Sequence, residues 1–146
     1  MEGILMLHGL NHDKMGRGDQ SSHGSITMED LNKQLKVKAQ ALDLEIDFFQ
    51  SNDEKQVIQK LEAVKNESYA GIIFNPGSWM EDGEEIARVL AKLDIPIIEI
   101  HMSNINKEKI SRNVIAPSVT GLVTGFGEKV YLIGLEILSE DIRKGC

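Results

Sequence analysis

The sequence predicts an α/β protein that folds as one three-layer domain over residues 1–146, with helices on both faces of a doubly wound parallel sheet. Short apolar segments of strand length alternate with segments of helical periodicity along the whole chain. The 146 residues suffice for a single sizeable core, and no linker, internal repeat or low-complexity segment divides them. Repeated strand–helix–strand units imply parallel strands joined by right-handed crossovers.

The first two strands and the first helix have clear local signals. Residues 3–9 (GILMLHG) form an apolar run that suits a buried strand better than a helix. Thr27 stands three residues before Asp30 in an N-cap arrangement, and the leucine spacing behind it predicts a helix over 28–42. Residues 44–50 (LEIDFFQ) alternate and are rich in β-forming residues, which predicts the second strand.

The middle of the chain continues the alternation. Ser51 or Asn52 can cap a second helix with an apolar inner stripe. Residues 71–75 (GIIFN) form a continuous apolar strand that is closed by a proline, and the spacing of apolar residues predicts a third helix over about 82–93.

The last third of the chain completes a flavodoxin-like sheet. Residues 95–101 (IPIIEIH) predict the fourth strand, and residues 125–144 predict a closing helix. Between them, we expect a short fifth strand within the looser segment 104–120.

Charge and cysteine usage exclude several functional classes. The net charge of −7 argues against a nucleic-acid partner, and the scattered positive residues do not suit an acidic membrane surface. No segment has the length of a membrane span or the pattern of a signal peptide. The single cysteine, Cys146, cannot form an internal disulfide, so we expect a cytoplasmic protein.

Polar residues gather where the predicted strands end. In open parallel sheets, ligands bind at the carboxyl ends of the strands. The polar segment 8–24 (HGLNHDKMGRGDQSSHG) follows the first strand and contains three of the four histidines, so we interpret it as a lid over the site. Its histidines have no recognised metal-ligand spacing and are expected to be solvated, so no metal site is predicted.

The stretch EIHMSN (99–104) is the most informative of these strand ends. Glu99 and His101 are two residues apart on a strand and so point to the same face, where a carboxylate can fix the tautomer of an imidazole that acts as a general acid. Met102 and Ser103 offer backbone N–H groups as an anion cradle. Alternatively, Glu99 and His101 only form a hydrogen bond with each other at the end of the sheet and have no catalytic role. Asn75 could likewise orient a ligand or cap a turn.

Six stretches of the chain together resemble one family, the type II 3-dehydroquinate dehydratases (type II dehydroquinases). They follow in the family's order and spacing: ILMLHGLN, HGSITMEDL, LEIDFFQSN, GIIFNPGSW, IPIIEIHMSNI and SVTGLVTGFGEKVYLIGLEIL. The resemblance implies a flavodoxin-like subunit of a dodecamer built from trimers. It also implies that the enzyme removes water from 3-dehydroquinate to give 3-dehydroshikimate in the shikimate pathway of aromatic amino acid biosynthesis, without a metal or organic cofactor.

The resemblance also assigns roles to individual residues. His101 matches the proton donor, Glu99 its orienting partner, and Asn11 the residue that positions a water near the enolate oxygen. The matching substrate-binding positions are Asn75 for a hydroxyl, the turn of Met102 and Ser103 for the carboxylate, and Arg112 for the basic segment, which is about two residues shorter here.

The chain departs from the family's pattern in its lid. His23 stands where the family has its catalytic tyrosine, and Gly18, beside Arg17, stands where the family has an arginine. A tyrosine needs a nearby cation to ionise at neutral pH, whereas a histidine is already a competent base there. We therefore expect His23 to remove the α-proton. His8 and Leu10 replace the asparagine and proline of the family's N-G-P-N turn.

Two further departures lie near the expected substrate site. Glu81 replaces a substrate-binding histidine, and Arg88 replaces an aspartate. A carboxylate beside a carboxylate substrate is repulsive unless it is protonated or paired, and Arg88 could pair with it. The alternative is a divergent paralogue that binds or converts another polyhydroxylated carboxylate, or one that only senses such a ligand.

Overall fold

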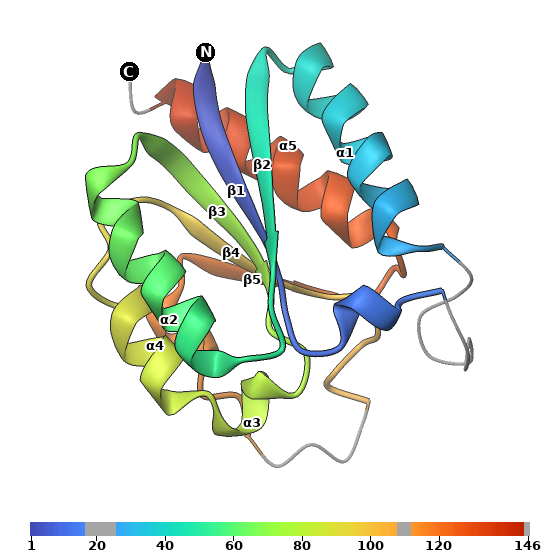
Figure 1. Ribbon diagram of the computed structural model, residues 1–146. Coiled ribbons are helices and arrows are strands. Elements are labelled where there is room, and N and C mark those ends of the chain that lie inside the picture. The colour runs from blue at the N-terminus through green and yellow to red at the C-terminus, as the bar shows by residue number, and fades with distance from the viewer. Residues whose placement is uncertain (17–25, 108–111, 145–146) are drawn as a thin grey trace.

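The computed structural model describes residues 1–16, 26–107 and 112–144, which build a three-layer α/β fold around one sheet (Figure 1). The sheet has five strands, all parallel, in the order β2-β1-β3-β4-β5. The strands are β1 (Glu2–His8), β2 (Leu44–Gln50), β3 (Tyr69–Asn75), β4 (Ile97–His101) and β5 (Gly121–Thr124). The predicted flavodoxin-like, doubly wound fold is therefore confirmed.

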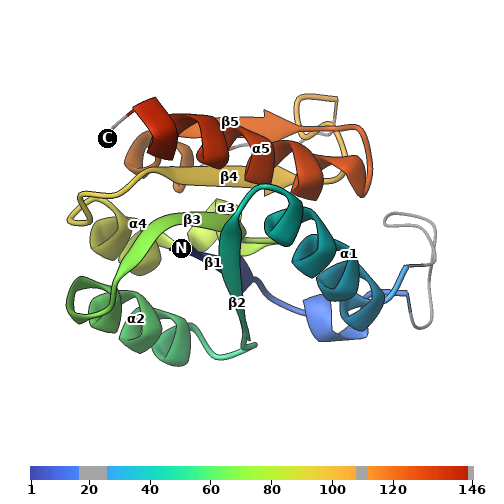
Figure 2. The same ribbon diagram turned by 90° about the horizontal axis from the view of Figure 1, so that it is seen from above.

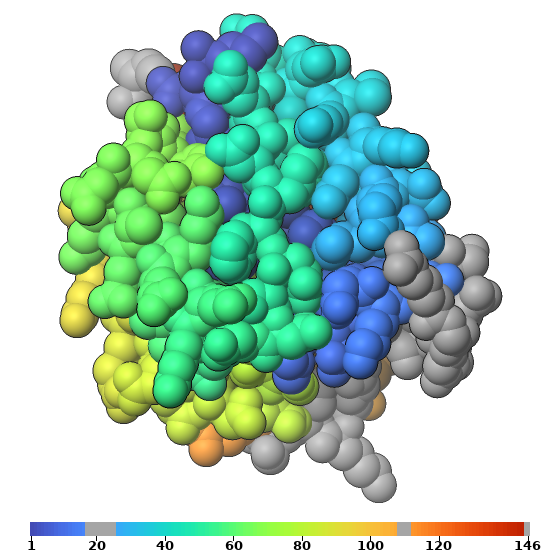
Figure 3. All heavy atoms as spheres, in the orientation of Figure 1, coloured from blue at the N-terminus to red at the C-terminus, as the bar shows by residue number. Residues whose placement is uncertain are grey.

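The helices cover the two faces of the sheet in pairs. They are α1 (Met28–Ala41), α2 (Glu54–Ala63), α3 (Trp79–Asp82), α4 (Glu84–Leu90) and α5 (Lys129–Lys144), with short 3₁₀ turns η1 (His12–Lys14), η2 (Val64–Asn66) and η3 (Ala116–Ser118). Helices α1 and α5 pack on one face, and α2 and α4 pack on the other (Figure 2). Strand β2 forms the edge that lies at the surface between α1 and α2 (Figure 3).

Residues of each strand alternate between the two cores. On β1, Ile4 and Met6 pack under α1 and α5, whereas Leu5 and Leu7 pack under α2 and α4. All four are fully buried, as expected for a parallel strand that is covered on both faces. The alternation decides which face each strand-end side chain reaches.

The caps of the first two helices have different outcomes. The Thr27 hydroxyl accepts the Asp30 N–H at 3.1 Å, so the predicted N-cap is confirmed. The prediction of Ser51 or Asn52 as the second cap is wrong, because the Asp53 carboxylate accepts the Lys55 N–H at 3.0 Å.

The predicted helix over 82–93 is wrong in its extent, because a break at Gly83 separates α3 from α4. The Gly83 N–H donates to the Trp79 carbonyl at 2.7 Å, and a Cβ at this position would lie 2.6 Å from the same oxygen. Glycine permits this close backbone approach, which a periodicity of apolar residues does not reveal.

The end of the chain also differs from the prediction. The fifth strand is Gly121–Thr124, beyond the segment 104–120 in which it was expected, and α5 begins at Lys129 rather than at residue 125. Residues Gly125, Phe126 and Gly127 have φ angles of 97°, 68° and 61°, which no right-handed helix can contain. This left-handed run delays the start of the helix.

The carboxyl ends of all five strands lie at one edge of the sheet, at the bottom of Figure 1. The N-terminus and the end of α5 lie at the opposite edge. In the part of the chain that the structure describes, no helix is long and apolar enough to cross a membrane.

Candidate active site

The strand-end side chains of the predicted site divide between the two faces of the sheet. Gln50 of β2, His8 of β1 and Asn75 of β3 lie side by side in register, and they point toward α1 and α5. Glu99 and His101 follow Ile97 at every second position, so they point toward α2 and α4. The two groups can approach one ligand only at the carboxyl edge, where the strands end.

Glu99 and His101 form the pair that their spacing predicts. The Glu99 side chain is fully buried, His101 is 6% exposed, and His101 Nε2 lies 2.5 Å from Glu99 Oε2. A buried carboxylate at this distance holds the imidazole in one orientation and balances its charge when the ring is protonated. The pair is therefore suited to proton transfer.

The sequence analysis missed Asn113, which completes this pair. Its amide nitrogen Nδ2 donates to Glu99 Oε2 at 2.9 Å, and its Oδ1 accepts the N–H groups of Ile115 and Ala116, both at 3.0 Å. The only available signal was an asparagine ahead of a proline-containing turn, which is common in loops of any function.

Contacts with β5 and the segment behind it fix the turn after His101. The carbonyl of His101 accepts from Gly125 N at 2.9 Å, and the carbonyl of Met102 accepts from Gly127 N at 3.0 Å. The Thr124 hydroxyl donates to the Ser103 carbonyl at 2.9 Å. The left-handed run at 125–127 thus fixes the backbone of the proposed anion cradle.

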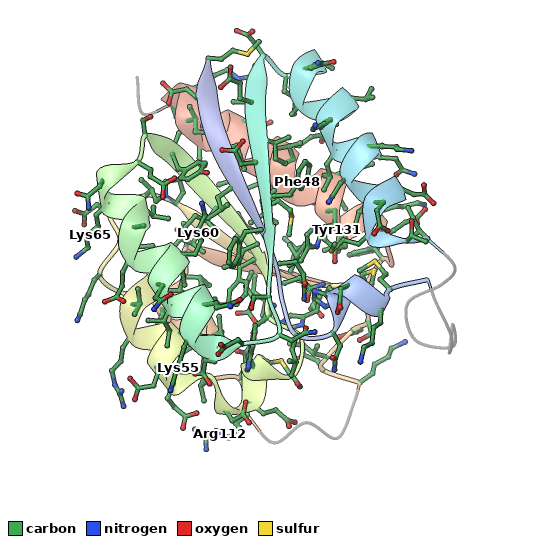
Figure 4. All side chains as sticks on the ribbon, viewed as in Figure 1. Phe48, Lys55, Lys60, Lys65, Arg112 and Tyr131 are labelled. Carbon is green, nitrogen blue, oxygen red and sulfur yellow. The ribbon has the colours of Figure 1, made fainter. Side chains whose placement is uncertain are left out.

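Asn75 is 4% exposed, and the protein already uses both ends of its amide. Its Nδ2 donates to the Tyr131 hydroxyl at 2.8 Å, and its Oδ1 accepts Gly77 N at 3.3 Å. Burial raises the pKa of Tyr131, so the hydroxyl is neutral when it accepts from Asn75. Tyr131 belongs to α5 (Figure 4), and its ring lies 6.0 Å from the ring of His8 between centroids. A substrate hydroxyl at Asn75 would compete with these contacts.

His8 is fully buried on the same face. Its Nε2 lies 2.7 Å from Asn32 Oδ1, and its ring stacks on Phe48 with centroids 6.3 Å apart. Burial lowers the pKa of His8 to about 4, against the smaller opposing effect of the Asn32 hydrogen bond. His8 is therefore neutral at physiological pH, and Nε2 donates to the amide oxygen.

The expectation that the loop histidines are solvated is wrong for His8 and His12. His12 is 6% exposed, and its Nδ1 accepts the Gly9 N–H at 2.8 Å, so its ring supports the turn after β1. Gly9 allows β1 to pass close to β3, since a Cβ there would lie 2.3 Å from the Asn75 carbonyl oxygen. His8 and His12 are therefore both buried parts of the scaffold.

Asn11 is exposed and adopts a left-handed conformation, with φ 66°. Its N–H donates to Asn52 Oδ1 at 2.7 Å, and the same oxygen accepts from Gln50 Nε2 at 2.9 Å. Asparagine tolerates this conformation better than most residues. The segment after β2 thus holds the backbone of Asn11 and leaves its side chain at the surface of the carboxyl edge.

The charged residues near this edge form ion pairs that differ from the expected one. Arg112 Nη2 lies 3.6 Å from Glu84 Oε2, and the Arg112 side chain points outward below α3 (Figure 4). The suggested pairing of Arg88 with Glu81 is wrong, because Arg88 pairs with Glu85 of its own helix. The break at Gly83 removes the regular helical spacing on which that suggestion depended.

The predicted base, His23, lies outside the described residues, as do Arg17 and Gly18. Among the residues that are described, no group of three or more His, Cys, Asp or Glu side chains could hold a metal ion.

Comparisons with known proteins converge on one family. Residues 2–139 match the model of the family described as Dehydroquinase class II. A 3-dehydroquinate dehydratase of Caldicellulosiruptor bescii is 38% identical over 142 residues, which is 96% of this chain and 98% of the relative. A 3-dehydroquinate dehydratase of Halothermothrix orenii is 34% identical over 99% of both chains. The crystal structure of type II dehydroquinase from Propionibacterium acnes has a TM-score of 0.90 at 29% identity, covering 97% of this chain and 98% of the other.

Proposed function

The chain belongs to the class II dehydroquinase family, and we propose that it is a 3-dehydroquinate dehydratase of the shikimate pathway. Such an enzyme is a hydro-lyase, which removes water from 3-dehydroquinate to give 3-dehydroshikimate. The observation that carries the proposal is the buried Glu99–His101 pair at the carboxyl edge of the sheet, within the family match over residues 2–139. The names of the relatives do not favour the alternative of a divergent, non-catalytic paralogue.

His101 is the proposed general acid. A base removes the proton next to the ketone, and the electron pair forms an enolate. The C–O bond then breaks, and the leaving hydroxide takes a proton from the His101 ring to depart as water. His101 Nε2 is engaged by Glu99, so Nδ1 is the nitrogen that would face the leaving group. The Glu99 carboxylate balances the positive ring before the transfer.

The remaining roles follow the resemblance. Asn11 would position a water near the enolate oxygen, with its backbone held by Asn52. The N–H groups of Met102 and Ser103 would bind the substrate carboxylate, from a turn whose carbonyls are held by the end of β5. The other proposed substrate ligands are Asn75 and Arg112.

We assign the base to His23. The experiment is an ultraviolet assay, because the enone product absorbs and the substrate does not. We expect His101→Ala and His23→Ala each to reduce turnover by roughly 100-fold or more, whereas Lys65→Ala, an exposed change at the opposite edge, should leave it unchanged. An unaltered rate for His23→Ala would refute its role. Failure of the wild type to convert 3-dehydroquinate would refute the dehydratase itself.

We further propose that the protein acts in the cytoplasm as a dodecamer built from trimers, with no nucleic-acid, membrane or cofactor partner. The resemblance supports the assembly, the single cysteine supports the compartment, and the net charge of −7 argues against a nucleic-acid partner. Phe126 is 72% exposed next to the edge strand β5, where Leu122 is 40% exposed. Apolar side chains at an open sheet edge are consistent with a contact between subunits. Sedimentation analysis would test the mass of the assembly.

A further inference from the structure

Asn113 contacts the reacting pair, although no role in the reaction has been assigned to it above. We propose that Asn113 is a positioning residue, whose amide keeps Glu99 as a hydrogen-bond acceptor and thereby places the proton of the neutral His101 ring on Nε2. Nδ1 is then the nitrogen that binds and releases the catalytic proton. The catalytic consequence rests on the proposed dehydratase function, whereas the tautomer of His101 does not depend on it.

The orientation of the Asn113 amide is determined by the backbone around it. Its oxygen accepts two N–H groups, from Ile115 and Ala116, both at 3.0 Å. A flipped amide would set its own N–H₂ against these two donors, so the flip is excluded by the hydrogen-bonding pattern. The nitrogen Nδ2 must therefore face Glu99 Oε2, and an amide nitrogen can only donate.

This donor restricts the protonation of the carboxylate. Glu99 Oε2 receives the Asn113 amide at 2.9 Å and faces His101 Nε2 at 2.5 Å, so a proton on Oε2 itself would oppose the amide donor. The other oxygen, Oε1, is buried and has no hydrogen-bond partner among the described residues, so a proton there would lack an acceptor. The carboxylate form is favoured, and the proton between it and the ring belongs to Nε2.

The tautomer has a direct consequence for the chemistry. A neutral histidine with its proton on Nε2 has its lone pair on Nδ1. When the ring takes up a second proton, that proton enters at Nδ1, on the side away from Glu99. Nδ1 can deliver this proton to a leaving hydroxide without breaking the contact with the carboxylate. The contact with Glu99 leaves Nδ1 to act as the acid, and Asn113 would keep the proton of the neutral ring on Nε2.

Two variants separate this positioning role from a purely structural one. Asn113 also holds the turn that leads into η3, because its oxygen accepts two backbone N–H groups. Asn113→Ala removes both functions. Asn113→Asp keeps an oxygen for the turn but replaces the donor with a second carboxyl group against Glu99, where like charges repel. Asn66→Asp in η2, which is exposed, serves as the matched control for the added charge.

The experiment combines steady-state kinetics, thermal melting and ¹⁵N chemical shifts of the histidine rings, with the His101 signals assigned from their absence in His101→Gln. For Asn113→Asp we expect kcat to fall by about 10-fold or more, with a smaller change in KM, because the acid loses its orientation. The melting temperature should stay near that of Asn66→Asp. The wild-type His101 should show the Nε2–H form, and this preference should be lost in Asn113→Asp.

Wild-type kcat and an unchanged tautomer in Asn113→Asp would reduce Asn113 to a turn cap and overturn the proposal. A wild-type His101 with its neutral proton on Nδ1 would also overturn it. The ring shifts are read without substrate, so they test the inference even if the wild type fails to convert 3-dehydroquinate. That failure would refute the dehydratase function separately.

Discussion

His8 should make the stability of this protein depend on pH in a range where most carboxylates keep their charge. The side chain is fully buried, and burial lowers its pKa from 6.5 to about 4. A histidine with a lowered pKa folds as the neutral ring, so the unfolded chain binds more protons than the folded one between these two values. The contribution of the neutral His8 ring to the free energy of unfolding is complete above pH 6.5. It decreases as the pH falls and is lost below about pH 4.

The size of this effect follows from the two pKa values of His8. The difference between 6.5 and about 4 corresponds to a ceiling of about 3 kcal/mol, at about 1.4 kcal/mol for each pH unit. Between pH 7 and pH 5 the linkage relation gives a loss of about 2 kcal/mol in the free energy of unfolding. That is a large part of the stability of an ordinary domain.

The assay is urea unfolding of the wild type and of His8→Asn at pH 7, 6 and 5. Asparagine does not titrate, and it is the residue that the family resemblance implies at this position. All other ionisable groups are shared, so the difference between the two proteins isolates His8. The protein concentration must be constant, because assembly also contributes to stability. We expect the wild type to lose about 2 kcal/mol relative to the variant between pH 7 and pH 5. Parallel pH profiles would refute the reasoning.

Three further changes test the scaffold around the site. Asn32→Asp replaces the amide oxygen that lies 2.7 Å from His8 Nε2 with a carboxylate, which favours the charged ring and should reduce the loss of stability between pH 7 and pH 5. The same urea series checks this, and an unchanged dependence of the unfolding free energy on pH would contradict it. Gly9→Ala sets a Cβ 2.3 Å from the Asn75 carbonyl oxygen and should lower the free energy of unfolding by about 2 kcal/mol or more. Thermal melting measures this, and a wild-type melting temperature would show that the ends of β1 and β3 can separate. Tyr131→Phe leaves the Asn75 Nδ2 donor without its acceptor and should reduce stability by about 1–3 kcal/mol in chemical denaturation, with no loss expected if water replaces the hydroxyl.

The fold was predictable where local signals and tertiary packing agree. The second strand, Leu44–Gln50, lies at the predicted residues, and Thr27 caps the first helix as expected. The two misplaced helix starts have one cause, because the spacing of apolar residues does not indicate where glycine lets the backbone turn. Gly83 separates α3 from α4, so the helix begins later than predicted, and the left-handed run at 125–127 delays the last helix.

The candidate site was predictable only as far as short spacing determines it. Glu99 and His101 are two residues apart, and their contact follows from the geometry of any strand. Asn113 is 14 positions away from Glu99, and Tyr131 is 56 positions away from Asn75. Contacts of this range depend on how the elements pack, so the composition of a segment cannot reveal them.

Two buried histidines end strands β1 and β4 of this sheet, and the residues that they contact give them different functions. His8 and His101 are both almost inaccessible, and each uses Nε2 for one short contact. The amide oxygen at His8 accepts a hydrogen bond but carries no charge, so burial dominates and the ring is neutral. The carboxylate at His101 can balance a positive ring that is equally hidden from water. The partner residue, rather than the histidine or its burial, therefore determines that His8 stabilises the fold and that His101 is suited to proton transfer.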